Sequence, residues 1–222
     1  MKRTKLRDRK LPDYTRSEEI FNMVTHIVGG GLGIIALVLC ILLAAIHKNL
    51  TGLLSGIVFG LSMIMLYTMS SIYHGLTTDT SKKVFQILDH CTIYFLISGT
   101  YTPLLLCALR HISPVACWIT FGVVWGCTAV AVTLTAIDLE KYKVFSMICY
   151  LGMGWCILFS IRSMYRALSA PLFWLLLSGG IFYTIGALLF KIGAHRRYFH
   201  SIFHIFVLLG SLCHTLCVLG IM

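Results

Sequence analysis

The sequence predicts an all-α polytopic membrane protein, a bundle of seven transmembrane helices. Of its 222 residues, 58% are hydrophobic and only 12% are charged. The apolar residues form long blocks, whereas a soluble protein spaces them periodically. Seven blocks reach the length of about 20 residues with which a helix crosses a hydrocarbon core of roughly 30 Å. A transmembrane β-barrel would alternate apolar and polar residues, and these blocks do not.

The connections between the blocks are too short to fold as a soluble domain. We therefore divide the chain into a basic tail, residues 1–20, and one seven-helix domain, residues 21–222. A basic tail before an apolar run resembles a signal peptide, but this run is longer than a signal-peptide core, so we expect it to be retained. We place the spans near residues 21–46, 51–73, 84–107, 114–137, 143–161, 171–191 and 201–222.

Proline, cysteine and glycine indicate how individual spans pack. Pro103 lacks an amide hydrogen and should kink the third span in its outer half. The nine cysteines fall within apolar segments and include no CxxC pair, so we expect buried thiols that form neither disulfides nor a metal site. Glycines four residues apart predict close helix packing at Gly52, Gly56 and Gly60 in the second span and at Gly122 and Gly126 in the fourth.

The distribution of Lys and Arg between the two sides of the spans predicts the orientation. With a cytoplasmic amino-terminus, the cytoplasmic side carries fourteen of the 18 Lys and Arg residues, seven of them in the tail, and the opposite side carries four. The positive-inside rule therefore predicts that the amino-terminus is cytoplasmic and the carboxyl-terminus outside the plasma membrane. The tail is expected to contact anionic membrane lipids, and no nucleic-acid partner is expected.

This orientation brings five polar residues to one depth of the membrane. Ser70 and His74 end the second span on the cytoplasmic side. Asp89 lies roughly 8 Å into the third span from that side. His200 and His204 begin the seventh span, also on the cytoplasmic side. Residues far apart in the sequence are thus predicted to share one layer.

Three of these residues form a candidate metal site. His200 and His204 are four residues apart, so their imidazoles lie on one face of the last span. With His74 they offer three neutral nitrogen ligands and leave one position of a tetrahedral ion open, as catalytic zinc sites do. Nitrogen ligands favour Zn²⁺ over magnesium or calcium, although iron, nickel and copper also accept them. The alternative is that these histidines only hydrogen-bond lipid headgroups.

Asp89 and Ser70 are the candidate catalytic residues. Asp89 is the only acidic residue inside the spans as placed above, and an unpaired carboxylate there is costly. Next to a dication it stays ionised and can act as general base toward metal-bound water, whose pKa is near ~7. Ser70, one turn before His74, can hydrogen-bond the same water or a developing oxyanion. The alternative partners of Asp89 are Lys82, Lys83 and His90.

Other histidines are expected to lie outside the ligand set. His26 falls in the same layer on the first span, where we expect it to pack or to hydrogen-bond. His214 is ten residues beyond His204, roughly 15 Å farther across the membrane, so it cannot join the same ion. His195 is expected in a loop or at the membrane interface.

The chain resembles the hemolysin III family, the bacterial branch of the progestin and adipoQ receptor (PAQR) family, which also contains the adiponectin receptors. The resemblance spans essentially the whole chain and implies that His74, His200 and His204 bind zinc, with Asp89 and Ser70 beside the metal-bound water. It rests on the segment Glu19–His26 with Gly29, on Ser70-x3-His74, on Leu88-Asp89 with Tyr101-Thr102-Pro103, and on His200-x3-His204.

Two classes of function follow from this resemblance. The first is a zinc-dependent hydrolase of a lipid amide or ester at the cytoplasmic leaflet, because the Ser, Asp and three-His set is similar to that of the alkaline ceramidases. The alternative is a non-enzymatic membrane effector: a hemolysin-like, pore-forming cytolysin, a membrane-homeostasis factor or a lipid sensor. The near absence of charged residues from the spans argues against an aqueous pore lined by this chain alone.

Overall fold

The computed structural model describes residues 3–193 and 196–222, and every regular element within them is a helix. Seven helical segments are long and apolar enough to cross a membrane, so the expected seven-helix membrane bundle is confirmed. Lys2 of the tail and His195 of the expected loop lie outside the described residues. The elements are η1 (Leu6–Asp8), α1 (Arg16–Ile46), α2 (Leu50–Gly75), α3 (Asp79–Pro103), η2 (Leu104–Leu109), α4 (Arg110–Ile112), α5 (Pro114–Ile137), α6 (Lys143–Gly154), η3 (Cys156–Ser160), α7 (Ile161–Ala167), α8 (Ala170–Ile192) and α9 (Phe199–Leu219).

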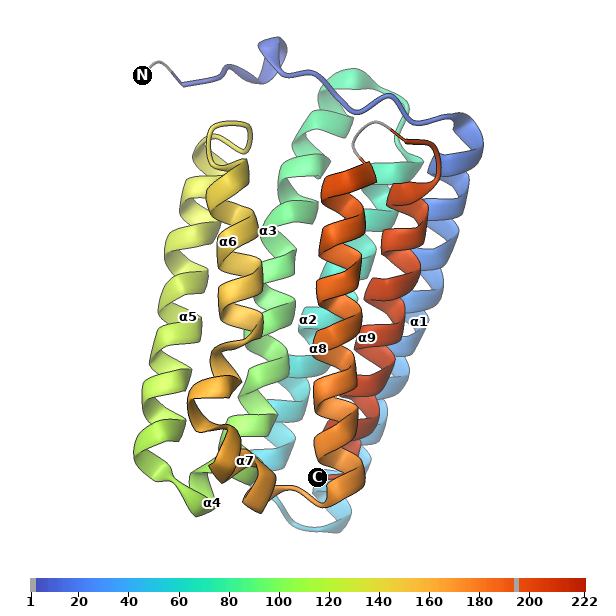
Figure 1. Ribbon diagram of the computed structural model, residues 1–222. Helices are drawn as coiled ribbons and strands as arrows, with labels where there is room; N and C mark the ends of the chain where they lie inside the picture. Colours follow the sequence, from blue (N-terminus) through green and yellow to red (C-terminus); the bar gives the residue numbers. More distant parts are fainter. Residues whose placement is uncertain (1–2, 194–195) are drawn as a thin grey trace.

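The helices pack side by side around two clusters of buried apolar side chains (Figure 1). One cluster joins α1, α2, α3 and α9, and Phe59 and Met63 of α2 are fully buried in it. The other cluster joins α3, α5, α6 and α8, and Val124 of α5 is fully buried there. Because α3 contributes to both clusters, it connects the two halves of the bundle.

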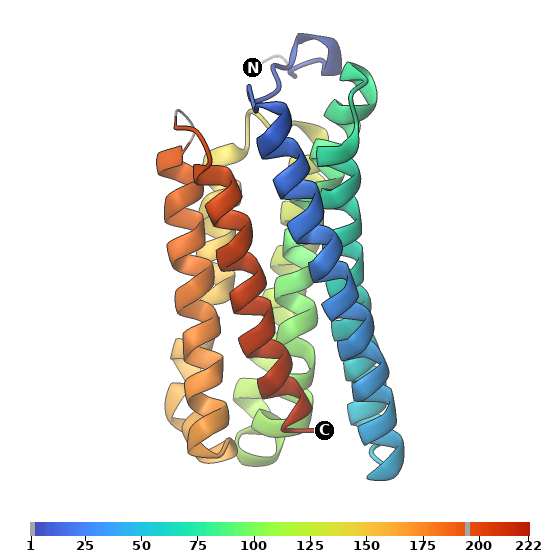
Figure 2. The same ribbon diagram turned by 90° about the vertical axis from the view of Figure 1, so that its right-hand side faces the viewer.

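The amino-terminal segment and the carboxyl-terminus lie at opposite ends of the bundle, as an odd number of spans requires (Figures 1 and 2). At the amino-terminal end, the buried Arg9 donates a hydrogen bond to Gln86 of α3 at 2.6 Å. The amide of Thr4 donates to Asp138 at 2.7 Å. Burial by itself raises the pKa of Asp138, but the N–H groups of Thr4 and Lys141 donate to its carboxylate and bring the pKa below its usual value. The tail is therefore tied across this end of the bundle.

The third span changes its helical form at Pro103. Proline ends α3 and is followed by η2, a π-helical segment, where the sequence predicts a kink. A wider helical turn accommodates the missing N–H donor. The hydroxyls of Thr100 and Thr102 donate to the carbonyls of Leu96 and Ser98, each at 2.8 Å, so both side chains bond within their own helix next to the proline.

The fifth span is not one continuous helix, a feature that the sequence analysis did not predict. It consists of α6, the 3-10 segment η3 and α7, with the break at Trp155. Tyr101 of α3 bridges the break, because its hydroxyl donates to the carbonyl of Gly154 at 2.9 Å and accepts from the amide of Ile157 at 3.0 Å. The indole of Trp155 donates to Thr184 of α8 at 3.0 Å. Side chains of neighbouring helices thus satisfy the freed backbone and fix the break in place.

Only two of the five spaced glycines lie in close helix contacts. A Cβ atom at Gly56 or Gly60 would lie 2.7 Å or 2.6 Å from side-chain carbons of α1, so close packing is confirmed there. Gly52 instead faces the side chain of its own helix's N-cap residue. A Cβ atom at Gly122 or Gly126 would meet nothing within 4 Å. The expectation was wrong for Gly122 and Gly126, because α5 buries residues such as Val124 and Thr128 and leaves these glycines exposed. It was wrong for Gly52 because the atoms nearest to its Cβ position belong to Asn49.

The first helix begins earlier than the hydrophobic block indicates. Thr15 is the N-cap of α1: its hydroxyl accepts from the Glu18 amide at 3.3 Å, and the Glu18 carboxylate accepts from the Thr15 amide at 2.8 Å. This capping box starts the helix at Arg16. Glu18 and Glu19 therefore lie in the first turn of a membrane-spanning helix.

Candidate metal centre

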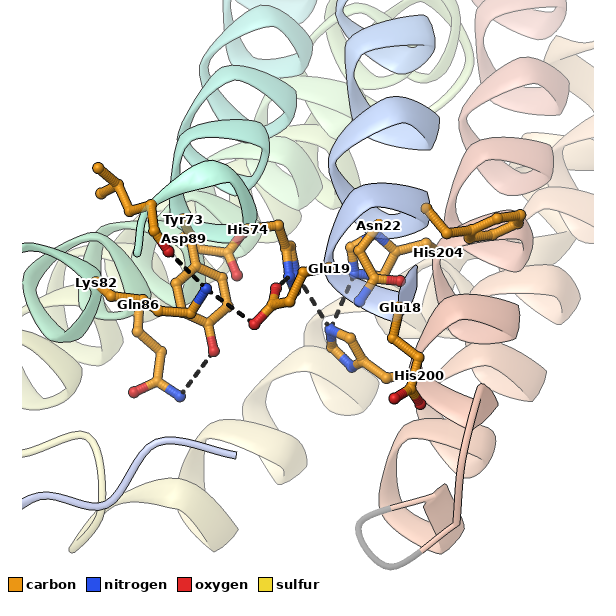
Figure 3. A network of polar contacts seen from close by, with 12 residues as sticks. Glu18, Glu19, Asn22, Tyr73, His74, Lys82, Gln86, Asp89, His200 and His204 are labelled. Carbon is orange, nitrogen blue, oxygen red and sulfur yellow. Dashed lines mark hydrogen bonds and ion pairs between the residues drawn. The ribbon is translucent and has the colours of Figure 1, made fainter. Parts of the chain in front are cut away.

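Three imidazoles from two helices converge at the amino-terminal end of the bundle. His74 lies in the last turn of α2, and His200 and His204 lie in the first two turns of α9. All three are buried, with exposed fractions of 3%, 9% and 1%. The Nε2 atoms of His74 and His200 are 3.4 Å apart, and those of His200 and His204 are 3.0 Å apart (Figure 3). This is a group that can hold a metal ion, as the sequence analysis expected.

The protonation of His74 is set by a carboxylate behind it. Its Nδ1 lies 2.6 Å from Glu19 Oε2, and the same carboxylate forms an ion pair with Lys82 at 2.8 Å (Figure 3). An ionised carboxylate only accepts hydrogen bonds, so Nδ1 carries the hydrogen. The lone pair of His74 Nε2 is therefore directed toward the other two histidines, which is the arrangement a metal ligand requires.

Asp89 and Ser70 lie next to each other at the same end of the bundle. Both line a cavity that is also lined by His200 and His204. The side chain of Ser70 lies close to the Asp89 carboxyl group. The structure thus brings all five predicted site residues into one region, although they come from three helices.

The lysines that could have paired with Asp89 pair with other acids. Lys82 contacts Glu19 at 2.8 Å, and Lys83 contacts Asp79 at 2.8 Å. The basic side chain beside Asp89 is His90, whose Nδ1 lies 3.8 Å from the carboxylate. That same nitrogen lies nearer, at 2.8 Å, to the carbonyl of Gln86. Among the described residues, Asp89 thus has no lysine or arginine partner.

The cavity continues from the metal centre into the interior of the bundle. Most of its walls are apolar side chains of α2, α3, α6, α8 and α9, such as Ile97, Leu176 and Val207. His214 lines its deep part and is engaged there by the carbonyl of Leu176, 3.1 Å from its Nε2. As expected, His214 is not part of the ligand group. The shape and lining suit an apolar chain whose polar end lies at the histidines.

His26 packs against the metal centre without belonging to it. Its ring stacks on His204, with ring centroids 3.8 Å apart, and contacts Tyr67 edge-on. Among the described residues, neither ring nitrogen has a hydrogen-bond partner, and the side chain of Asn22, one turn earlier, has none either. The packing role predicted for His26 is what the structure shows.

The sequence analysis missed the contribution of the chain just before and at the start of α1. The ring of Tyr14 stacks on His200, with centroids 4.8 Å apart and planes 18° from parallel. Burial, and then the charge of Glu19, raise the pKa of the Tyr14 hydroxyl. Glu18 and Glu19 were assigned to the tail because they precede the apolar block. The capping-box spacing of Thr15 and Glu18 was a usable signal that the helix starts here.

The chain is similar in sequence to several known proteins. The family model described as "Haemolysin-III related" matches residues 14–215. Hemolysin-3 of Bacillus cereus is 38% identical over 202 residues, which cover 91% of this chain and 90% of that protein. The Hemolysin-3 homolog of Bacillus subtilis is 36% identical over 211 residues, covering 93% and 95%. The human monocyte to macrophage differentiation factor is 27% identical over 162 residues, covering 71% and 66%.

Proposed function

The chain belongs to the haemolysin-III related family, and on that premise we propose that it is a zinc-binding membrane enzyme that hydrolyses an amide or ester bond in a lipid. As a member of this family with seven apolar spans, it is a multi-pass membrane protein, located in bacteria in the cell membrane. The observation that carries the proposal is the convergence of three buried imidazoles at one end of an apolar cavity.

The spacing and chemistry of the donors fit zinc. In a tetrahedral site with Zn–N distances near 2.0–2.1 Å, two ligand nitrogens lie about 3.3 Å apart. The Nε2 separations of His74 from His200 and of His200 from His204, 3.4 Å and 3.0 Å, bracket this value, and all three ligand atoms lie within 4.8 Å of one another. The donor set is all nitrogen, which favours zinc over the oxygen-preferring magnesium and calcium. His74, His200 and His204 would hold the ion next to the cavity that His200 and His204 line.

The residues beside the histidines have the groups that hydrolysis needs. When bound, the ion supplies Lewis acidity at the polar end of the cavity. A carboxylate oxygen of Asp89 takes the proton of the attacking water and returns it to the leaving amine or alcohol. The Ser70 hydroxyl, which lies close to that carboxylate, would orient it by donating a hydrogen bond. Asp89 and Ser70 are thus the proposed catalytic pair.

The cavity supports a lipid as the substrate. Its apolar walls along α3, α6 and α8 suit an acyl chain, and its polar groups gather at one end. A lipid amide or ester carries its scissile bond next to the headgroup, where Asp89 and the histidines lie. With the predicted orientation, this end faces the cytoplasmic leaflet, and membrane lipids are the expected partners.

A metal analysis with paired activity measurements tests the proposal. Wild-type protein purified in detergent and reconstituted into nanodiscs should retain one equivalent of zinc. His74→Ala and His204→Ala should each retain less than a tenth of an equivalent, because two imidazoles do not hold the ion. His111→Ala, which removes an exposed histidine far from the site, is the matched control and should keep the full equivalent.

The activity measurement uses two probes, an N-acyl sphingoid base and a glycerophospholipid, each with a fluorescent acyl chain. Release of the labelled fatty acid by wild type but not by His204→Ala supports the hydrolase. One bound zinc with no release from either probe would overturn the hydrolase proposal while leaving the metal site in place.

Membrane lysis is the second candidate, favoured by the name of the Bacillus cereus relative, Hemolysin-3. It predicts leakage of dye from liposomes that contain the protein. Leakage that persists in His204→Ala would assign the activity to the bundle rather than to the metal centre. If liposomes with wild type and liposomes with His204→Ala both retain their dye, this candidate is rejected.

A further inference from the structure

We propose that the adjacent carboxylates Glu18 and Glu19 are positioning residues that set the metal ligands of α9 and α2 at their working separation. The inference rests on the proposed metal site and deepens it. Helix α1 contributes none of the three histidine ligands, yet its first turn contacts the ligand-bearing segments of both other helices.

Glu19 acts on α2. One carboxylate oxygen lies 2.6 Å from His74 Nδ1, and the other lies 2.8 Å from the ammonium of Lys82. The Lys82 ammonium also donates to the carbonyl of Leu76 at 3.0 Å, just past the end of α2. A carboxylate that accepts from the far nitrogen of a ligand histidine fixes both the tautomer and the orientation of the ring. Lys82 balances the charge that this contact buries.

Glu18 acts on α9. Its side chain is 3% exposed, and one oxygen accepts from the backbone N–H of Tyr198 at 2.6 Å. The other oxygen accepts from Arg197 at 3.3 Å. Tyr198 is the N-cap of α9 and adopts a left-handed backbone conformation, with φ of 61°, two residues before His200. A bulky residue keeps this conformation only where surrounding contacts hold it, and Glu18 supplies two of them.

The local structure of α1 explains how the neighbouring residues Glu18 and Glu19 contact two different helices, α9 and α2. Consecutive helical residues point about 100° apart, so one faces α2 while the other faces the start of α9. The capping box with Thr15 fixes the first turn, and thereby both carboxylates, relative to the helix axis. The separation of His74 from His200 thus depends on a short rigid segment that joins their two helices.

Zinc affinity tests the Glu19 half of the proposal. Competition with a chromogenic chelator should show zinc binding weakened about 10- to 100-fold in Glu19→Ala, the range found when partners of metal-binding histidines are removed. Glu19→Gln keeps a hydrogen-bond acceptor for Nδ1 and should recover part of the loss. Asp8→Asn, an exposed acid of the same amino-terminal segment, is the control and should bind zinc as wild type does. Equal affinity in wild type and Glu19→Ala would overturn this half.

Hydrogen exchange tests the Glu18 half independently of metal. In Glu18→Ala, which removes the acceptor, the Tyr198 amide and the first amides of α9 should exchange at least 10-fold faster than in wild type, with no change in α5. Unchanged exchange would overturn this half. Wild-type protein that binds no zinc would overturn the proposed function, whereas normal zinc binding with an unaffected Glu19→Ala variant would overturn only the inference drawn from Glu19.

Discussion

Asp89 is the residue of the site whose charge is hardest to keep inside a membrane. It lines the cavity, lies close to Ser70 and is 3.8 Å from His90. Lys82, which is close to Asp89 in sequence, instead forms an ion pair with Glu19. A dication held by the neighbouring histidines is the charge that would keep Asp89 ionised. Its carboxylate would then be a base located where a lipid carbonyl can reach it.

Asp89→Asn separates catalysis from metal binding, because it keeps the shape of the side chain and removes its basicity. We expect the variant to retain one equivalent of zinc and to lose about 10²- to 10⁴-fold in fatty-acid release, the usual contribution of a general base. Asp79→Asn makes the same chemical change at an exposed position of the same helix and should be fully active. Unchanged turnover in Asp89→Asn would reject the assigned role, and loss of zinc would make Asp89 a ligand.

At the scale of elements, the position of α1 against α2 sets how the first-turn carboxylates approach His74. The two helices are in close contact at Gly56 and Gly60, where side-chain carbons of α1 occupy the space of a Cβ atom. At Gly60 the backbone of Leu37 is also within 2.7 Å of that position. A methyl group there cannot be accommodated by moving a flexible side chain alone.

Gly60→Ala and Gly122→Ala form a matched pair that tests this contact. Gly60→Ala should lower the free energy of unfolding in mixed micelles by about 1–3 kcal/mol, because α1 must move away from α2. Gly122→Ala adds the same methyl group where nothing lies within 4 Å and should be neutral or stabilise by roughly 0.5–1 kcal/mol. Similar losses in both variants would show that helix contact is not the cause.

The orientation of the whole molecule in the membrane determines which leaflet lies next to the candidate site. The histidines and the amino-terminal segment share one end of the bundle, and the carboxyl-terminus lies at the other (Figure 1). Lys and Arg are concentrated on the side of the amino-terminus, and the positive-inside rule assigns that side to the cytoplasm. Substrate would then enter from the inner leaflet.

Reporter fusions at the two termini test this orientation. Alkaline phosphatase should be active when fused to the carboxyl-terminus and inactive at the amino-terminus, and a cytoplasmic fluorescent protein should show the reverse pattern. The same result at both termini would contradict seven spans. An inverted pattern would place the metal centre at the outer leaflet and move the search for substrate there.

The sequence by itself determined the seven spans, the layer of Ser70, His74 and Asp89, and the pairing of His200 with His204. These depend on hydrophobic length and helical periodicity, which are local properties of the chain. Only the tertiary structure decided that Glu19 contacts His74, because the contact depends on α1 beginning at Arg16, before the apolar block. Side-chain contacts of this kind depend on where helices end and how they pack, and hydropathy records neither. Hydropathy and helical periodicity therefore identified the three histidines, and packing identified the side chains that contact them.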